Sequence, residues 1–106
     1  MKCLLLCLIL LSGIVHSTGT QEFAVLNVGA VRSGGYAFID ISPDQSVSDC
    51  TRKNQLRWEL VTDTDKAILS LAIAAQTTGK KMLISLLDGD CLGDAARPNV
   101  VYLLGQ

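Results

Sequence analysis

The first stretch of the chain is almost continuously apolar. A cationic start at Lys2 precedes the apolar run Cys3–Leu11, and small polar residues occupy positions 17–20. A short cationic start, a short apolar core and a small-residue exit are typical of a secretory signal peptide. The pattern predicts a signal peptide at 1–17, with cleavage between residues 17 and 20, and one small domain at 18–106. An uncleaved anchor is the alternative, although the run is short for a bilayer span.

Beyond residue 17, the spacing of apolar residues predicts five strands and one helix. The clearest two-residue period is QLRWELV at 55–61, in which two leucines and a tryptophan alternate with polar residues. Such alternation is typical of a strand with one buried face. Gly34–Gly35 separates the first two strands and supplies the positive φ angles of a tight hairpin. The predicted strands are Phe23–Val31, Tyr36–Ile41, Gln55–Val61, Met82–Leu87 and Val100–Leu104.

Turn and loop signals separate these strands. Ser42–Pro43–Asp44 ends the second strand, because proline cannot donate to a strand ladder and aspartate favours turns. The polar segment Gln45–Asn54 is predicted to be an exposed loop. Asp88–Gly89–Asp90 predicts a turn and Leu92–Asn99 a loop. Gly29 marks a candidate bulge in the first strand.

The segment Asp63–Thr78 has the apolar spacing of an α-helix. Thr62 or Asp63 can cap its N-terminus, and Gly79 stands where a C-terminal glycine cap belongs. One apolar stripe is expected to face the core: Ile68, Leu71, Ala72 and Ala75.

Three further residues, Leu69, Ile73 and Ala74, widen the apolar face of this helix beyond one stripe. A helix that is apolar over a wide arc is covered on more than one side. One helix on one small sheet has a single core to face, so the extra surface predicts an interface with a second subunit. The alternative is that alanine is simply a good helix former that tolerates water.

Composition and charge restrict the function. The full chain has a net charge of −1, and removal of residues 1–17, which hold one basic and no acidic residue, makes it −2. This balance offers no basic field for nucleic acid or anionic lipid, and no stable membrane insertion is expected. The only histidine is His16, within the predicted signal peptide. The remaining domain therefore has no histidine for nucleophile activation, general base catalysis or metal binding.

Cys50 and Cys91 are the two cysteines outside the predicted signal peptide. An even pair in a secreted chain most often forms a disulfide. The bridge would close a 42-residue loop, which the chain-entropy model values at about 4 kcal/mol. A free thiol or a link between chains is the alternative. Because 89 residues bury only a modest core, such a covalent link or oligomerisation is expected.

The predicted order β-β-β-α-β-β indicates a mainly β, α+β fold. It matches the OB-fold, a five-stranded Greek-key barrel with its helix between the third and fourth strands. We therefore expect an OB-fold-like barrel or curled sheet, with one helix and one disulfide. Other small α+β sheets can share this element order.

A run of motifs also resembles known families. Cys50, a tryptophan strand at Leu56–Leu60, the helix segment KAILSLAIAA at Lys66–Ala75, the turn Gly79–Lys80 and finally Cys91 follow one another. This order resembles a family of short secreted, mostly bacterial proteins of unassigned role. More distantly, the chain resembles the B subunits of AB5 toxins, particularly the subtilase-cytotoxin and pertussis-like group.

The toxin resemblance rests on Asn27–Val31, Thr78–Lys80 and Leu83–Ile84, which fit the outline of a V-G-x-I strand, a T-G-[QK] helix end and a following strand. It implies an OB-fold pentamer that binds cell-surface glycans, with the helices packed around a central pore. The chain is shorter than those subunits, lacks their aromatic-rich segment after the fourth strand and has cysteines for only one bridge. No glycan-binding residue is carried over from the family.

Three residues are candidate ligand contacts. Tyr36 and Tyr102 are the aromatic residues best placed for exposure on strands, whereas Trp58 lies on the apolar face of its strand and is expected in the core. Arg57 belongs to a small basic group, completed by Arg52 and Lys53, that could meet an acidic sugar or a partner's carboxylates. The alternatives are half-buried sheet residues for the tyrosines and an ordinary solvated face for the basic group.

Acidic residues are weaker candidates. Asp88, Asp90 and Asp94 could offer oxygen ligands to calcium, but their spacing does not match the twelve-residue calcium loop, and Asp-Gly is a turn signature. A pair of carboxylates could in principle hydrolyse a glycoside. A cleft that holds such a pair at a set separation is hard to build in 89 residues.

These observations favour a secreted or periplasmic, non-enzymatic binding module with no cofactor. It is expected to form a homo-oligomer, and the toxin resemblance implies a glycan or another cell-surface receptor as its ligand and a pentamer as one form of the oligomer. The alternative is a small secreted structural or inhibitory protein that adds a strand to a protein partner or plugs its cleft. A small hydrolase is the third hypothesis.

Overall fold

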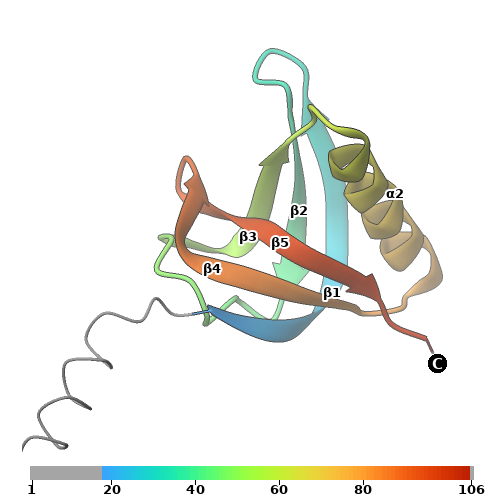
Figure 1. The fold of residues 1–106 in the computed structure, drawn as a ribbon. Coiled ribbons are helices and arrows are strands. Elements are labelled where there is room, and N and C mark those ends of the chain that lie inside the picture. The colour runs from blue at the N-terminus through green and yellow to red at the C-terminus, as the bar shows by residue number, and fades with distance from the viewer. Residues whose placement is uncertain (1–17, 106) are drawn as a thin grey trace, which may run out of the picture.

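A computed structural model describes residues 18–105 of the chain. The predicted signal peptide lies outside these residues. Five strands and one helix follow one another in the expected order (Figure 1). The elements are β1 (Thr18–Val31), β2 (Tyr36–Ser42), β3 (Arg52–Glu59), α2 (Asp63–Thr78), β4 (Met82–Leu92) and β5 (Ala95–Leu103).

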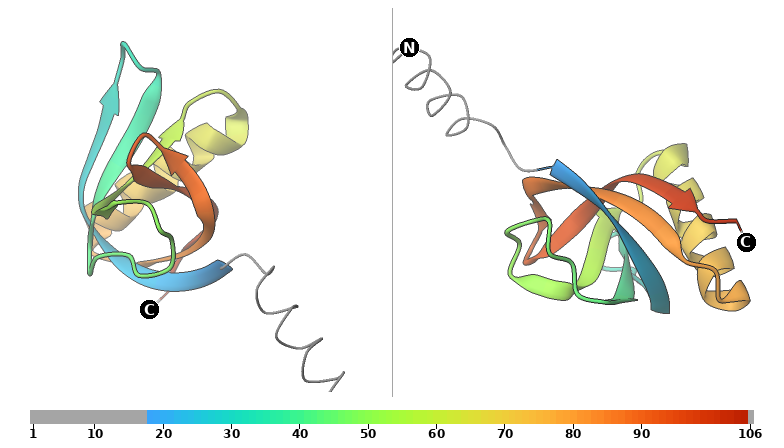
Figure 2. Two further views of the ribbon diagram at one scale, coloured as in Figure 1. Left: turned by 90° about the vertical axis from the view of Figure 1, so that its left-hand side faces the viewer. Right: turned by 90° about the horizontal axis from the view of Figure 1, so that it is seen from below.

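The strands form a closed barrel in the order β1-β2-β3-β5-β4. The long strand β1 belongs to both halves of the barrel, because its first part pairs with β4 and its second part with β2. β3 and β5 run parallel and close the barrel, while the other neighbouring strands are antiparallel. The two views of Figure 2 show α2 beside the barrel, and its contacts are mainly with β1 and β5. The OB-fold-like class and the position of the helix are therefore confirmed.

The helix begins and ends where its caps predict. The side chain of Thr62 accepts a hydrogen bond from the backbone N–H of Asp65, and the Asp65 carboxylate accepts one from the N–H of Thr62. Gly79 ends the helix in the left-handed region, with φ 75°. Ala72 and Ala75 are buried, and Ile68 and Leu71 pack partly buried against the core. These four residues are the apolar stripe predicted from the sequence.

Residues from all five strands fill the interior. The largest fully buried side chains are Phe23, Ile39, Leu56, Met82, Ile84, Leu86 and Gln45. β2 and β3 alternate buried and partly buried residues, as expected for strands with one face on a core. Trp58 is also buried, and its indole N–H donates to the backbone oxygen of Asp65. The core position expected for Trp58 is confirmed, and this hydrogen bond joins β3 to the first turn of α2.

The last two strands differ most from the prediction. Asp88–Gly89–Asp90 lies within β4 rather than in a turn, and β5 begins at Ala95, within the predicted loop Leu92–Asn99. The reason is that β4 and β5 pair again at Cys91↔Ala96 and Leu92↔Ala95, beyond an irregularity in their register. The turn between them falls at Gly93–Asp94. A local Asp-Gly signal is overridden here by pairing between the two strands.

Smaller corrections concern the first three strands. β1 begins at Thr18 rather than Phe23, because its first residues pair with β4. Its bulge lies between Val25 and Asn27 and not at Gly29. In the hairpin that follows, Gly35 alone has a positive φ, of 65°. β3 covers Arg52–Glu59, so it begins before and ends before the predicted strand.

Candidate functional site

The candidate site lies on the outer face of β2 and β3. Tyr36, at the start of β2, pairs with Glu59 of β3, and the next outward pair is Phe38 with Arg57. The residues between them on β2 point into the core, because side chains alternate across a strand. The register of β2 against β3 therefore places aromatic and charged side chains side by side on the outside of the barrel.

Arg57 and Tyr36 are in contact on this face. The guanidinium carbon of Arg57 lies 5.9 Å from the centroid of the Tyr36 ring, within the range of a cation–π interaction. The Arg57 side chain also donates a hydrogen bond to the Gln55 side-chain oxygen and forms an ion pair with Asp94, with N···O 3.1 Å. The hydrogen bond to Gln55 and the ion pair with Asp94 thus hold the Arg57 guanidinium beside the Tyr36 ring. We call these four residues the Tyr36–Arg57 surface.

Asp94 connects the Tyr36–Arg57 surface to the start of β3. Both oxygens of its carboxylate accept hydrogen bonds from Nε of Arg52, at 3.2 Å, and its backbone oxygen accepts one from the Arg52 N–H. The side-chain hydrogen bonds from Arg52, together with the positive charges of Arg52 and Arg57, lower the pKa of the Asp94 carboxyl. Asp94 is therefore a fixed anion in the β4–β5 turn that positions two arginines of β3.

Next to this anion the surface is hollowed. An open hollow of about 450 Å³ is lined by polar and charged residues: Asp44, Thr51, Arg52, Lys53, Asn54 and Asp94. It offers cationic donors, carboxylate acceptors, a hydroxyl and an amide within one concave surface. The basic group predicted at Arg52, Lys53 and Arg57 is thus mixed with acidic residues. Asp94 is the residue that the lining of the hollow shares with the Tyr36–Arg57 surface.

The loop between β2 and β3 is held by buried polar contacts. Gln45 is only 2% exposed, and its side-chain oxygen accepts hydrogen bonds from the N–H groups of Val47 and Ser48. Its amide nitrogen donates to the Ser48 backbone oxygen, which also accepts a 2.6 Å hydrogen bond from Nζ of Lys53. Part of the predicted exposed loop is therefore buried and well ordered by its own side chains. Asp44 and Thr51 on either side of this buried segment, and Lys53 bonded to it, line the hollow.

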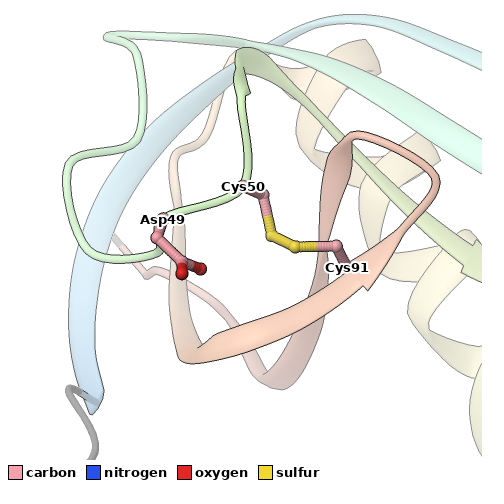
Figure 3. A group of neighbouring side chains, drawn as sticks. All are labelled: Asp49, Cys50 and Cys91. Carbon is pink, nitrogen blue, oxygen red and sulfur yellow. A yellow bond between two sulfur atoms is a disulfide. The ribbon is translucent and has the colours of Figure 1, made fainter.

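The predicted disulfide ties this loop to the end of β4. Cys50 and Cys91 are bonded to each other, with their Cα atoms 5.9 Å apart (Figure 3). Beside them, the Asp49 N–H donates to the Asp88 carboxylate, and the Gly89 N–H donates to the Asp49 carboxylate. Asp49 and the two sulfur atoms form a group of ligand-type atoms, but each sulfur atom is already bonded to the other. The disulfide and these two hydrogen bonds together link the β2–β3 loop to β4.

The aspartates considered as calcium ligands have separate protein partners. Asp88 accepts the N–H of Asp49, Asp90 contacts Arg97, and Asp94 contacts Arg52 and Arg57. Each of these carboxylates is therefore engaged by a different protein group among the described residues.

Arg97 was not singled out from the sequence, yet it joins three elements. Its guanidinium makes two hydrogen bonds to the Glu59 carboxylate, at 2.8 and 2.7 Å, and others to the Asp90 side chain and the Cys91 backbone oxygen. The hydrogen bonds from Arg97 lower the pKa of Glu59 to about 2, and Glu59 in turn raises the pKa of Arg97. The only sequence signal was an arginine inside an apolar segment next to a proline.

Tyr102, the third predicted ligand contact, lies in another part of the barrel. It is on β5, 56% exposed, and pairs with Leu83 of β4. The structure therefore brings Tyr36 and Arg57 together and places Tyr102 apart from them. On the predicted oligomer face of the helix, Leu69 and Ala74 are partly buried and Ile73 is 49% exposed. Leu69 packs against the core of its own barrel.

In the described part of the chain, no helix has the length and apolar character needed to cross a membrane. Comparisons with protein-family models, with curated proteins and with solved structures found no match to this chain.

Proposed function

We propose that this protein is a secreted, non-enzymatic module that binds a glycan on the outer face of β2 and β3. The observation that carries the proposal is the Tyr36 ring with Arg57 fixed beside it, next to a polar hollow of about 450 Å³. An aromatic ring offers an apolar face for stacking, while fixed guanidinium and carboxylate groups bind hydroxyl groups directionally. A sugar presents both kinds of surface.

The position of this surface in the fold supports the proposal. OB-folds that bind oligosaccharides and oligonucleotides use the face of strands 2 and 3, together with the loops between strands 1 and 2 and between strands 4 and 5. Tyr36 follows the first of these loops, and Asp94 lies in the second. This support is an analogy at the level of the fold. The near-neutral charge favours the glycan over the nucleic acid.

Rigidity is the third support. A binding surface that is already ordered loses less conformational entropy when it binds. Gln45, the disulfide and the Asp94 contacts hold the walls of the hollow in place before any ligand arrives. The secreted location is proposed with the function, because a disulfide of this kind is stable in oxidising compartments.

Binding to an array of neutral and acidic glycans tests the proposal with the purified protein. We expect one glycan class to bind, and Tyr36→Ala to weaken its binding at least tenfold. Tyr36→Phe, which keeps the ring, should retain most of the affinity. An array without binding, or equal binding by the wild type and Tyr36→Ala, would overturn the proposed site. Specific capture of one protein by the same preparation would favour the structural or inhibitory alternative.

The predicted homo-oligomer is the remaining part of the proposal. Several copies of a weak glycan site in one assembly raise the overall affinity for a cell surface without any new contact. Ile73 is the most exposed large apolar residue of the helix. A pentamer, as the toxin resemblance implies, would have five times the mass of one chain in sedimentation equilibrium.

A further inference from the structure

The second half of β5 has a neighbouring strand on one side only. The last pair between β3 and β5 is Leu56↔Ala96, whereas β5 stays paired with β4 as far as Leu103. From Asn99 onward, no strand of residues 18–105 pairs with the other edge of β5. Figure 1 shows β5 crossing the front of the barrel, and the right-hand view of Figure 2 shows it at the outside of the molecule. We call Asn99–Leu103 the free edge of β5.

Most of this free edge lacks the features that normally prevent strands from associating. Such features include charged residues, prolines and bulges along an exposed edge. Pro98 and the register irregularity at Asn99 protect the start of this edge, whereas Val100–Leu103 contain no charged residue, no proline and no further irregularity. Val100 and Tyr102 are 40% and 56% exposed. An uncharged, apolar strand edge of this kind is expected to be covered in solution.

We propose that the free edge of β5 pairs antiparallel with the same edge of a second copy of this chain, forming a two-fold dimer. With Val101 on the two-fold axis, Val100 of each copy lies opposite Tyr102 of the other. Pairs of an aromatic and a β-branched residue directly opposite each other stabilise antiparallel strands. The symmetry produces this pair twice, and both pairs lie beyond the irregularity at Asn99.

The chemistry of the edge favours a second copy over a different partner. Like charges directly opposite one another oppose pairing of identical strands, and NVVYL places none there. A distinct protein partner would normally be selected by complementary charges, which this edge does not offer. The same residues also explain why Tyr102 is exposed although it lies away from the Tyr36–Arg57 surface. This inference does not depend on glycan binding.

Arg97 marks where the free edge begins. Its side chain reaches from β5 to Glu59 on β3. This ion pair holds the two strands together at that point. After Pro98 no such side-chain bridge is present among the described residues. The inward-facing Val101 and Leu103 still pack against the core. The fold can therefore keep its interior intact while the outer edge of β5 binds another strand.

Sedimentation equilibrium of the purified protein at micromolar concentration tests the dimer. We expect a mass of two chains for the wild type and at least a tenfold weaker association for Tyr102→Lys. The double variant Val100→Glu with Tyr102→Lys should restore the dimer, because the proposed register places the introduced carboxylate of each copy opposite the introduced ammonium group of the other. Ile73→Lys, on the helix, is the matched control and should leave the dimer intact.

Fluorescence of the buried Trp58 and thermal melting show that each variant is folded. A monomeric or pentameric wild type would overturn the proposal. So would a dimer that Tyr102→Lys leaves intact, or one that Ile73→Lys disrupts instead. A folded double variant that stays monomeric would overturn the register centred on Val101.

Discussion

Arg97 and Glu59 form a two-point ion pair between strands that are far apart in the sequence. The guanidinium donates to both carboxylate oxygens, at 2.8 and 2.7 Å, and links β5 to β3 beyond their last backbone pair. This ion pair therefore links β3 and β5 through their side chains, beyond the point where their backbone pairing ends. It also fixes the strand that carries Arg57 relative to the strand that follows Asp94.

The first prediction concerns the pH dependence of this ion pair. The pKa of Glu59 is about 2 in the folded protein, against an ordinary value of 4.5. Its contribution to stability is therefore complete above about pH 4.5 and is lost as the pH falls toward 2. Because both side chains are partly exposed, we expect this contribution to be only about 1 kcal/mol. Glu59→Gln should be less stable than the wild type at pH 7.

Urea unfolding of the two proteins at several pH values checks this prediction. The difference in the free energy of unfolding should be constant between pH 7 and 5 and should shrink steadily below pH 4.5. Asp63→Asn, in the first turn of α2, is a control carboxylate away from Arg97. A difference between wild type and Glu59→Gln that stays constant down to pH 2 would contradict the assignment.

The second prediction concerns the disulfide. Replacement of both Cys50 and Cys91 by alanine should lower the free energy of unfolding by about 4 kcal/mol, the loop-closure value for this bridge. For a domain of this size that is a large part of the total stability. Urea unfolding of the double variant and of the wild type, with and without reductant, measures the loss. Reductant should destabilise only the wild type, and an equal effect on both would rule out the bridge as its target.

Features defined by local sequence were the most predictable. The helix Asp63–Thr78 carries its caps within its own neighbourhood, in Thr62 and Gly79, so its bounds could be predicted from the sequence. The disulfide followed from having only two cysteines, Cys50 and Cys91, outside the predicted signal peptide. The caps left few alternative bounds for the helix, and the cysteine count left few alternative pairings for the disulfide.

Features that depend on distant pairing were not predictable. Asp88–Gly89–Asp90 has a local turn signal, but β4 continues through it because its end pairs again with β5. The candidate site shows the same limit. Tyr36 and Arg57 were singled out separately, and only the register of β2 against β3 brings them together. Asp94, which positions Arg57, is 37 residues away in the sequence and gave no signal of that contact.

The third prediction concerns the close packing of β1 against β2. The ring of Phe38 lies directly over Gly29, so a Cβ atom added there would meet the ring, with Cε1 only 2.7 Å away. Gly29→Ala should therefore lower the free energy of unfolding by about 2 kcal/mol, as overpacking usually does. The double variant Gly29→Ala with Phe38→Leu should recover part of that loss. Gly105→Ala, which has open space around its Cβ position, is the control in thermal unfolding.

The fourth prediction concerns the N-terminus of α2. Thr62 accepts the Asp65 N–H and completes a reciprocal capping box. Thr62→Ala should cost about 1 kcal/mol of stability, whereas Thr62→Ser, which keeps the hydroxyl, should cost much less. The two backbone N–H groups of Val61 and Thr62 lower the pKa of Asp65. Urea unfolding of both variants at neutral pH measures the difference, and equal stabilities would argue against the cap.

The last prediction concerns how Arg57 is held beside Tyr36. Arg57 contacts Gln55 and Asp94 at the same time as the ring, which its branched, planar guanidinium allows. A lysine keeps the positive charge but offers a single ammonium group without that fork. Arg57→Lys should therefore leave folding unchanged and weaken glycan binding about tenfold, which corresponds to about 1.4 kcal/mol. Titration of the glycan identified on the array measures the affinity. Lys66→Arg, at an exposed lysine on α2, should bind as the wild type does, because it has no part in holding Tyr36. An unchanged affinity for Arg57→Lys would mean that charge alone, rather than the fixed geometry of Arg57, supports binding.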